Sequence, residues 1–158
     1  LNTSFREYQG ADWQLNYRVE TENAGDFSVS VLSSHIIAYY SKFDEYSDEI
    51  NFVDYYIYEP RSQQNISINW RYQDWSTTLF MDRLGHMEIY NDEKTSPHII
   101  TNLSTFYNYS PDLSLYLSVR NIDDKMPQRD SAYGYPYYNT SYFSAFGRYV
   151  SAGFNYRF

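Results

Sequence analysis

Tyrosines gather in two stretches of this chain, at 41–63 and at 122–146. Six carboxylates stand among the aromatic residues of the first stretch, and this combination could bind a cationic chelate, a divalent ion or a sugar. Tyrosine offers a large, rigid contact surface at a low entropic cost. The alternative interpretation of both stretches is a solvated surface loop. The candidate ligand-contacting residues are Tyr46, Tyr55, Tyr56, Tyr58, Tyr133, Tyr135, Tyr137 and Tyr138.

Other reactive side chains give weaker signals. His86 and His98 flank the segment 87–97, which contains three carboxylates, and imidazole with carboxylate can hold a transition metal. Their spacing matches no established site, so we interpret them as ordinary exposed histidines. Asp123 and Asp124 are adjacent, and neighbours in a strand point in opposite directions, which does not suit paired acid–base chemistry. We therefore expect no catalytic residues, no metal site, no cofactor and no enzymatic activity.

The composition narrows the class of protein. The 158 residues include no Cys, so a disulfide scaffold or a thiolate metal site is excluded. A net charge of -8 argues against nucleic acid as a partner, because phosphates would be repelled. Aromatic residues make up 21% of the chain, which favours strands and the aromatic girdles of membrane barrels. A mean hydropathy of -0.67 still permits a membrane barrel, since only alternate residues of a strand face lipid.

Strands must position these loops, because seven stretches alternate apolar and polar residues with a period of two. In each stretch we predict that the more apolar side faces outward. Within the second stretch, residues 36–40 have no clear period, which indicates a β-bulge or an uncertain register. The seven predicted strands lie at about 13–20, 27–40, 66–72, 75–81, 99–109, 113–120 and 147–158.

The predicted strands are joined by connections that alternate in length. Three are tight turns, at 23–26, 73–74 and 110–112, and three are long, at 41–63, 85–97 and 122–146. Outer-membrane barrels have short periplasmic turns and long extracellular loops, whereas a soluble sandwich has no reason to segregate the two. The last strand follows a long loop, so its carboxyl end should lie on the short-turn side, in the periplasm.

An odd number of strands indicates that the sequence is part of a larger barrel. Bacterial single-chain barrels use even numbers of strands, starting at eight. An unclosed sheet would present unpaired backbone groups to lipid at a cost of several kcal/mol each. We therefore predict an all-β, antiparallel, up-and-down transmembrane barrel segment, and we expect the sequence to begin inside a longer protein.

The carboxyl-terminal part resembles the TonB-dependent outer-membrane receptors. The resemblance covers most of the chain but its motifs are short. They are Tyr-Gln-Gly-Ala-Asp-Trp at 8–13, Asn-Leu-Ser-Thr-Phe-Tyr at 102–107, Leu-Tyr-Leu-Ser-Val-Arg-Asn-Ile-Asp-Asp-Lys-Met-Pro at 115–127, and Gly147-Arg148. In that family a segment of the Val-x-Asn-[Leu/Ile]-x-Asp type, a loop, a Gly-Arg pair and a terminal aromatic close the barrel.

The resemblance implies an outer-membrane receptor and transporter of a Gram-negative bacterium. Its barrel of about 22 strands would enclose a plug, and residues 1–158 would supply the last seven strands. The ligand would be scarce, such as a ferric siderophore, cobalamin or an oligosaccharide. The plug domain is absent from these residues, and the TonB complex would be reached only through the missing amino-terminal part. The surrounding partner would be outer-membrane lipid.

Phe154, Tyr156 and Phe158 end the last strand on its apolar side. In outer-membrane proteins such an ending resembles the signal that the barrel-assembly machinery recognises, and an exposed strand edge is a plausible object for β-augmentation. The plainer interpretation is that these residues are lipid-facing aromatics, and both can hold.

Two alternatives stay open at this stage. One is a complete eight-stranded outer-membrane protein with a structural or adhesive role, in which residues 1–9 supply part of an extra strand. The other is a soluble lipocalin-like binding module, whose apolar side would face inward.

Overall fold

The computed structural model describes residues 5–53, 60–87 and 93–158, and these form an all-β fold. The strands are longest at the amino-terminal side of the sheet and shortest at the carboxyl-terminal side. In chain order they are β1 Phe5–Thr21, β2 Gly25–Lys42, β3 Ile50–Asn51, β4 Ser62–Tyr72, β5 Trp75–Leu84, β6 His98–Ser110, β7 Leu113–Arg120 and β8 Tyr149–Tyr156.

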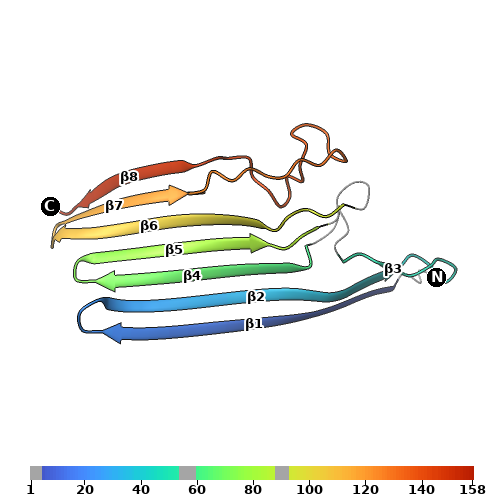
Figure 1. The fold of residues 1–158 in the computed structure, drawn as a ribbon, viewed down its shortest axis with the longest axis horizontal. Helices are drawn as coiled ribbons and strands as arrows, with labels where there is room; N and C mark the ends of the chain where they lie inside the picture. The colour runs from blue at the N-terminus through green and yellow to red at the C-terminus, as the bar shows by residue number, and fades with distance from the viewer. Residues whose placement is uncertain (1–4, 54–59, 88–92) are drawn as a thin grey trace.

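The strands form one antiparallel, up-and-down sheet in the order β1-β2-β4-β5-β6-β7-β8, and the two-residue β3 pairs with β2. The tight turns 22–24, 73–74 and 111–112 lie at one end, and the long connections lie at the other (Figure 1). The chain ends on the short-turn side, as the sequence predicts. The predicted all-β, antiparallel, up-and-down arrangement is therefore confirmed, and the sheet itself is open.

Strand pairing brings the apolar sides of all seven long strands onto one face of the sheet. Paired residues of neighbouring strands lie on the same face, because their side chains project in the same direction. One row of pairs runs across the whole sheet through Tyr17, Val29, Ile68, Leu79, Leu103, Val119 and Val150. The sequence predicts the apolar side of each strand from the residues of that strand alone. Strand pairing brings all seven predicted apolar sides onto the same face, which supports the alternation of apolar and polar residues.

The opposite face carries small polar side chains in a second continuous row. This row runs through Arg18, Ser28, Asn69, Thr78, Ser104, Ser118 and Ser151. The Thr78 hydroxyl donates to Asn69 Oδ1 at 2.8 Å, and the hydroxyls of Ser104 and Ser118 lie 3.3 Å apart. Phe80, an exception in the sequence pattern, also lies on this polar face, opposite Ser67.

The predicted bulge near residues 36–40 is confirmed. Gln9 pairs with Ala38, but the next residue, Gly10, pairs with Ile36, so Ile37 has no partner in this ladder. An extra residue in one strand bends it and changes which side chains face each way. This shift explains why residues 36–40 lack the period of the rest of the strand.

The described residues bury very few large apolar side chains, and those lie near the loop end: Ile36, Ala38, Phe52 and Met87. The sheet is a single layer, so no second layer covers its apolar face within this part of the chain. β1 pairs only with β2, and β8 only with β7, among the described strands. Six antiparallel pairings separate β1 from β8, so these two edge strands run in the same direction. They cannot pair antiparallel with each other to close the sheet.

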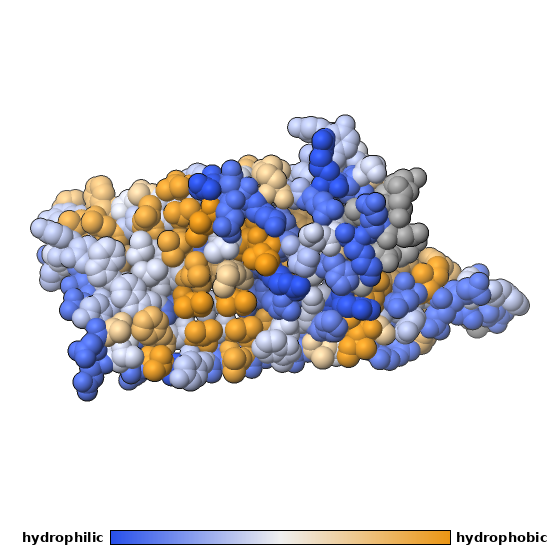
Figure 2. Space-filling model, viewed as in Figure 1, coloured by the Kyte–Doolittle hydropathy of each residue, from blue (hydrophilic) through white to orange (hydrophobic). Residues whose placement is uncertain are grey.

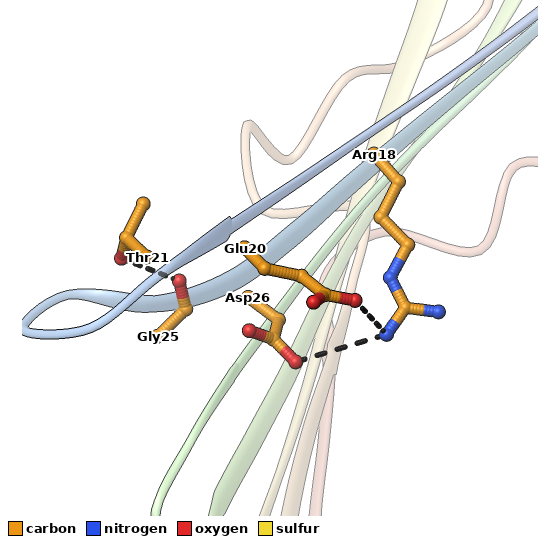
Figure 3. A network of polar contacts seen from close by, with 5 residues as sticks. All are labelled: Arg18, Glu20, Thr21, Gly25 and Asp26. Atoms are coloured by element: carbon orange, nitrogen blue, oxygen red, sulfur yellow. Dashed lines mark hydrogen bonds and ion pairs between the residues drawn. The ribbon is translucent and has the colours of Figure 1, made fainter.

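The turn between β1 and β2 is held by local polar contacts. The Thr21 hydroxyl donates to the carbonyl of Gly25 at 2.7 Å. On the polar face beside it, Arg18 lies 2.8 Å from Glu20 and 3.8 Å from Asp26, as Figure 3 shows. All three charged side chains are exposed, so the network contributes little to stability.

Gly25 is the position where we expect a single methyl group to disrupt this turn. Its φ is +85°, and an added Cβ would lie 2.3 Å from the carbonyl oxygen of Arg71. Gly25→Ala should therefore lower the free energy of unfolding by ~2 kcal/mol or more. The urea midpoint of the full-length protein measures this effect. In the control, Gly134→Ala, a new Cβ meets nothing within 4 Å, and a loss as large as that of Gly25→Ala would contradict the explanation.

Candidate functional site

The apolar face is a candidate contact surface, because its large side chains are exposed. Trp13, Leu15, Val150 and Phe154 are each more than half exposed. Figure 2 shows the apolar residues gathered in an orange band that crosses the strands, with paler residues at the short-turn end. The apolar face comprises alternate residues of 13–19, 27–33, 66–72, 75–81, 99–107, 113–119 and 150–156.

Within these ranges the apolar face carries no charged side chain, whereas Arg18, Arg71 and Arg120 lie on the polar face. Beyond them, at the loop end of β5, Arg83 lies on the same side as the apolar face and pairs with Gln64 and Ile99. Two hydroxyls of the apolar face satisfy each other where β5 meets β6: the oxygens of Thr77 and Thr105 lie 2.9 Å apart. This arrangement suits a surrounding that offers no hydrogen bonds.

Aromatic residues border the apolar face at its short-turn end. Tyr72 pairs with Trp75, and Trp75 pairs with Tyr107, with the last two rings 4.5 Å apart. The Trp70 ring stacks on Tyr72, and its indole N–H donates to the carbonyl of Ala24 at 2.8 Å. Such amphipathic rings are typical of a girdle at the boundary between lipid and water.

The predicted assembly signal lies at the free edge of the sheet. Phe154 and Tyr156 project from the apolar face of β8, where Phe154 pairs with Leu115. The Tyr156 and Phe158 rings contact each other edge to face, 5.2 Å apart. Phe158 is fully exposed, so within these residues its ring supports no packing except that contact.

The motif residues from the two ends of the long loop 121–148 meet at its base. Asn121 is buried, accepts from the Lys125 amide at 2.8 Å and donates to the carbonyls of Lys125 and Phe146. The Asp124 carboxylate accepts from the Arg148 amide at 2.7 Å. We call this set of contacts the loop base.

The backbone explains why these residue types suit the loop base. Asn121 and Asp124 have φ angles of 53° and 52°, in the left-handed region that Asn and Asp tolerate best among side chains with a Cβ. A Cβ at Gly147 would lie 2.6 Å from Asp124 Oδ1, so glycine makes room for the carboxylate. The Asn, Asp and Gly-Arg positions of the sequence motif thus form one structural unit.

Asn121→Ala should open the loop base, because it removes three side-chain hydrogen bonds at a buried position. We expect trypsin to cleave at Lys125 or Arg129 about tenfold faster than in the unaltered protein, in line with a loss of ~1–3 kcal/mol. Asn121→Gly keeps the φ angle accessible and should give the same result. The exposed Asp123→Ala serves as the control, and equal cleavage of all variants would contradict the role of the hydrogen bonds.

A cavity of about 720 Å³ lies between this loop and the polar face of the sheet. Its floor consists of side chains from three rows of paired residues at the loop end of β4 to β8. Its other wall comes from the loop, with Tyr142, Phe143, Ser144 and Phe146. The first row of paired floor residues is Gln63, Leu84 and His98, and the second is Asn65, Asp82 and Ile100. Asn102 and the pair Arg120 and Tyr149 complete the floor.

The tyrosines predicted in 122–146 lie elsewhere in the loop. Tyr135 is 89% exposed and contacts Tyr137 edge to face, and the Arg129 guanidinium lies 5.0 Å from the centre of the Tyr137 ring. Tyr133 and Tyr138 are partly buried. The cavity is lined by other aromatic residues of the same stretch, and none of the four predicted tyrosines is among its lining residues.

Of the tyrosines predicted in 41–63, Tyr46 is 89% exposed, and Tyr55, Tyr56 and Tyr58 lie outside the described residues. In the same stretch Asp44 closes a local turn. Hydrogen bonds from the hydroxyl and amide of Ser47 and from the amide of Tyr46 hold the pKa of Asp44 below its usual range. This carboxylate is thus engaged in shaping the loop.

His86 and His98 are both half-buried, so the prediction that they are ordinary exposed histidines is wrong, and His98 lines the cavity. Its ring contacts Phe143 edge to face at 5.0 Å. Across 5–53, 60–87 and 93–158 no three His, Cys, Asp or Glu side chains gather into a metal site. The described residues also include no helix long and apolar enough to cross a membrane.

No family model, curated protein or solved structure matches this chain. The functional proposals that follow therefore depend on the geometry of the sheet, the loop base and the cavity.

Proposed function

We propose that this chain forms part of the wall of an outer-membrane barrel that takes up a scarce ligand in the manner of a TonB-dependent receptor. The observation that carries the proposal is the uncharged apolar face that continues across all seven long strands of the described sheet. Lipid is the surrounding that such a face requires, since a mid-membrane Arg costs ~2–4 kcal/mol. The segregation of turns and loops supports the proposed orientation, in which the carboxyl terminus lies in the periplasm.

The parallel course of β1 and β8 favours a larger barrel. An all-antiparallel barrel needs an even number of strands, so these seven need an odd number of additional ones to close. Upstream strands of a longer chain would meet this need and pair both edges. A complete barrel of eight strands would need one more full strand from the first residues.

The uptake role is supported by the loop end of the sheet. Residues of the receptor-like motif form the loop base. The loop that these contacts close encloses a cavity together with the polar face of the sheet. A lipocalin-like module would instead place its ligand against the apolar side. Ferric siderophores, cobalamin and oligosaccharides are the ligand classes that this role includes.

Fractionation of the native cells tests the proposal. The full-length protein should sediment with outer membranes, resist carbonate extraction and dissolve in detergent. Deleting its gene should reduce growth on one of the three ligand classes when that ligand is scarce. Recovery of the protein in the soluble fraction would contradict the proposal.

A further inference from the structure

The cavity between the loop 121–148 and the sheet has a lining that selects among ligand classes. We propose that it binds a neutral oligosaccharide, with aromatic rings of the loop side against the sugar faces and amides of the sheet on the sugar hydroxyls. This inference rests on the proposed function, within which it names one ligand class. The cavity volume of about 720 Å³ lies within the range of ~300–1,000 Å³ typical of small-molecule sites.

Exposed aromatic rings line the cavity from both sides, Phe146 on the loop wall and Tyr149 on the floor. Phe146 is 88% exposed and Tyr149 is 61% exposed, although both line the cavity. Phe143 is held in place by its edge-to-face contact with His98, 5.0 Å away. A sugar ring has an apolar face of C–H groups, and an aromatic face attracts these groups while removing both surfaces from water. The exposed rings therefore provide stacking surfaces that packing within the described chain leaves uncovered.

Amide side chains dominate the polar side of the cavity. Gln63 and Asn65 project from β4 and Asn102 projects from β6, and each amide group can both donate and accept hydrogen bonds. Sugar hydroxyls also do both, so amides match them without any fixed charge. Asn65 donates to the Asp82 carboxylate, which leaves the second carboxylate oxygen available to accept from a hydroxyl.

The charges of the cavity favour a neutral ligand over an anionic chelate. Asp82 and Arg120 both project from the polar face, one of each charge, whereas Arg83 follows Asp82 in β5 and projects from the opposite face. The Arg83 guanidinium already donates to Gln64 at 2.7 Å and to Ser62 at 3.3 Å. A multiply charged ferric chelate would require an excess of unengaged cations, because its own charges lose their hydration on binding. The near balance of charge instead leaves hydrogen bonding and stacking as the main sources of affinity.

Calorimetry on the full-length protein in detergent tests the inference. Maltotriose, cellotriose, xylotriose and chitotriose are titrated separately, with ferric citrate and cyanocobalamin as the competing classes. We expect saturable binding of at least one trisaccharide and a Kd about tenfold weaker for Phe146→Ala. Phe146 is highly exposed, so this change should leave folding intact, which the temperature of the heat-induced gel shift verifies. Phe43→Ala, also an exposed phenylalanine but outside the cavity, should leave the Kd unchanged.

The outcomes separate this inference from the proposed function. If none of the trisaccharides binds, the proposed ligand class is overturned, whether or not ferric citrate or cyanocobalamin binds. This holds even if the protein fractionates with outer membranes. Equal weakening by Phe146→Ala and Phe43→Ala overturns the cavity as the site. A protein that binds a trisaccharide but is absent from the outer membrane contradicts the proposed function alone.

Discussion

Leu79→Arg is expected to abolish assembly of the full-length protein into the outer membrane, whereas Thr78→Arg is expected to permit it. Leu79 lies near the middle of β5 on the apolar face and pairs with Ile68 and Leu103. An arginine there would face the lipid interior at a cost of ~2–4 kcal/mol, enough to reduce the assembled fraction at least tenfold. The measurement is the amount of heat-shifted, folded protein in isolated outer membranes.

The paired variant isolates the effect of the face from the effect of the substitution. Thr78 is the preceding residue of the same strand, but its side chain lies on the polar face beside Asn69 and Ser104. Its arginine would enter a wet surrounding, and the loss is limited to the hydrogen bond to Asn69. Similar amounts of folded protein for the two variants would contradict the assignment of the apolar face to lipid.

Phe158→Ala is expected to reduce assembly in cells several-fold while leaving the stability of the assembled protein nearly unchanged. The Phe158 ring is fully exposed and contacts Tyr156 at 5.2 Å, so a purely structural role predicts a small effect, ~0.5 kcal/mol. A role in recognition by the assembly machinery predicts a large effect on yield, since the exposed edge of β8 is where another strand would pair. Pulse-chase measurement of the folded protein separates the rate of assembly in cells from the stability of the assembled protein.

The control for Phe158 is another exposed phenylalanine. Phe43 is 65% exposed and lies in the connection after β2, away from the free edge of β8. Phe43→Ala should assemble at the rate of the unaltered protein. Slow assembly of both variants, or unaltered assembly of Phe158→Ala, would restrict the terminal aromatics to a lipid-facing role.

The strands and their faces could be predicted from the sequence because alternation is a local property. Each strand shows its apolar side in its own residues, as Leu115 and Leu117 do against Ser114 and Ser118. Pairing with the neighbouring strands then brings these sides onto one face. The loss of period at 36–40 even located the bulge, since an extra residue interrupts alternation.

The loop base and the cavity could not be predicted, because they depend on residues far apart in the chain. Asn121 meets the carbonyl of Phe146 across 25 positions, and no local pattern specifies that contact. The cavity combines side chains of several strands with the inner side of the loop, so its members appear only when the sheet is formed. Tyrosine content pointed to the loop, while the closure of the loop base determines which aromatic residues face the sheet.

Lipid exposure along β5 tests the central claim most directly. The chain contains no cysteine, so single cysteines can be placed at 76–81, one at a time, and spin-labelled in the full-length protein in bilayers. The account predicts that labels at 77, 79 and 81 collide mainly with oxygen dissolved in lipid, and that labels at 76, 78 and 80 collide mainly with a water-soluble nickel complex. Oxygen collisions that are highest at 76, 78 and 80, or collisions that do not alternate along the strand, would contradict the assignment of the apolar face to lipid.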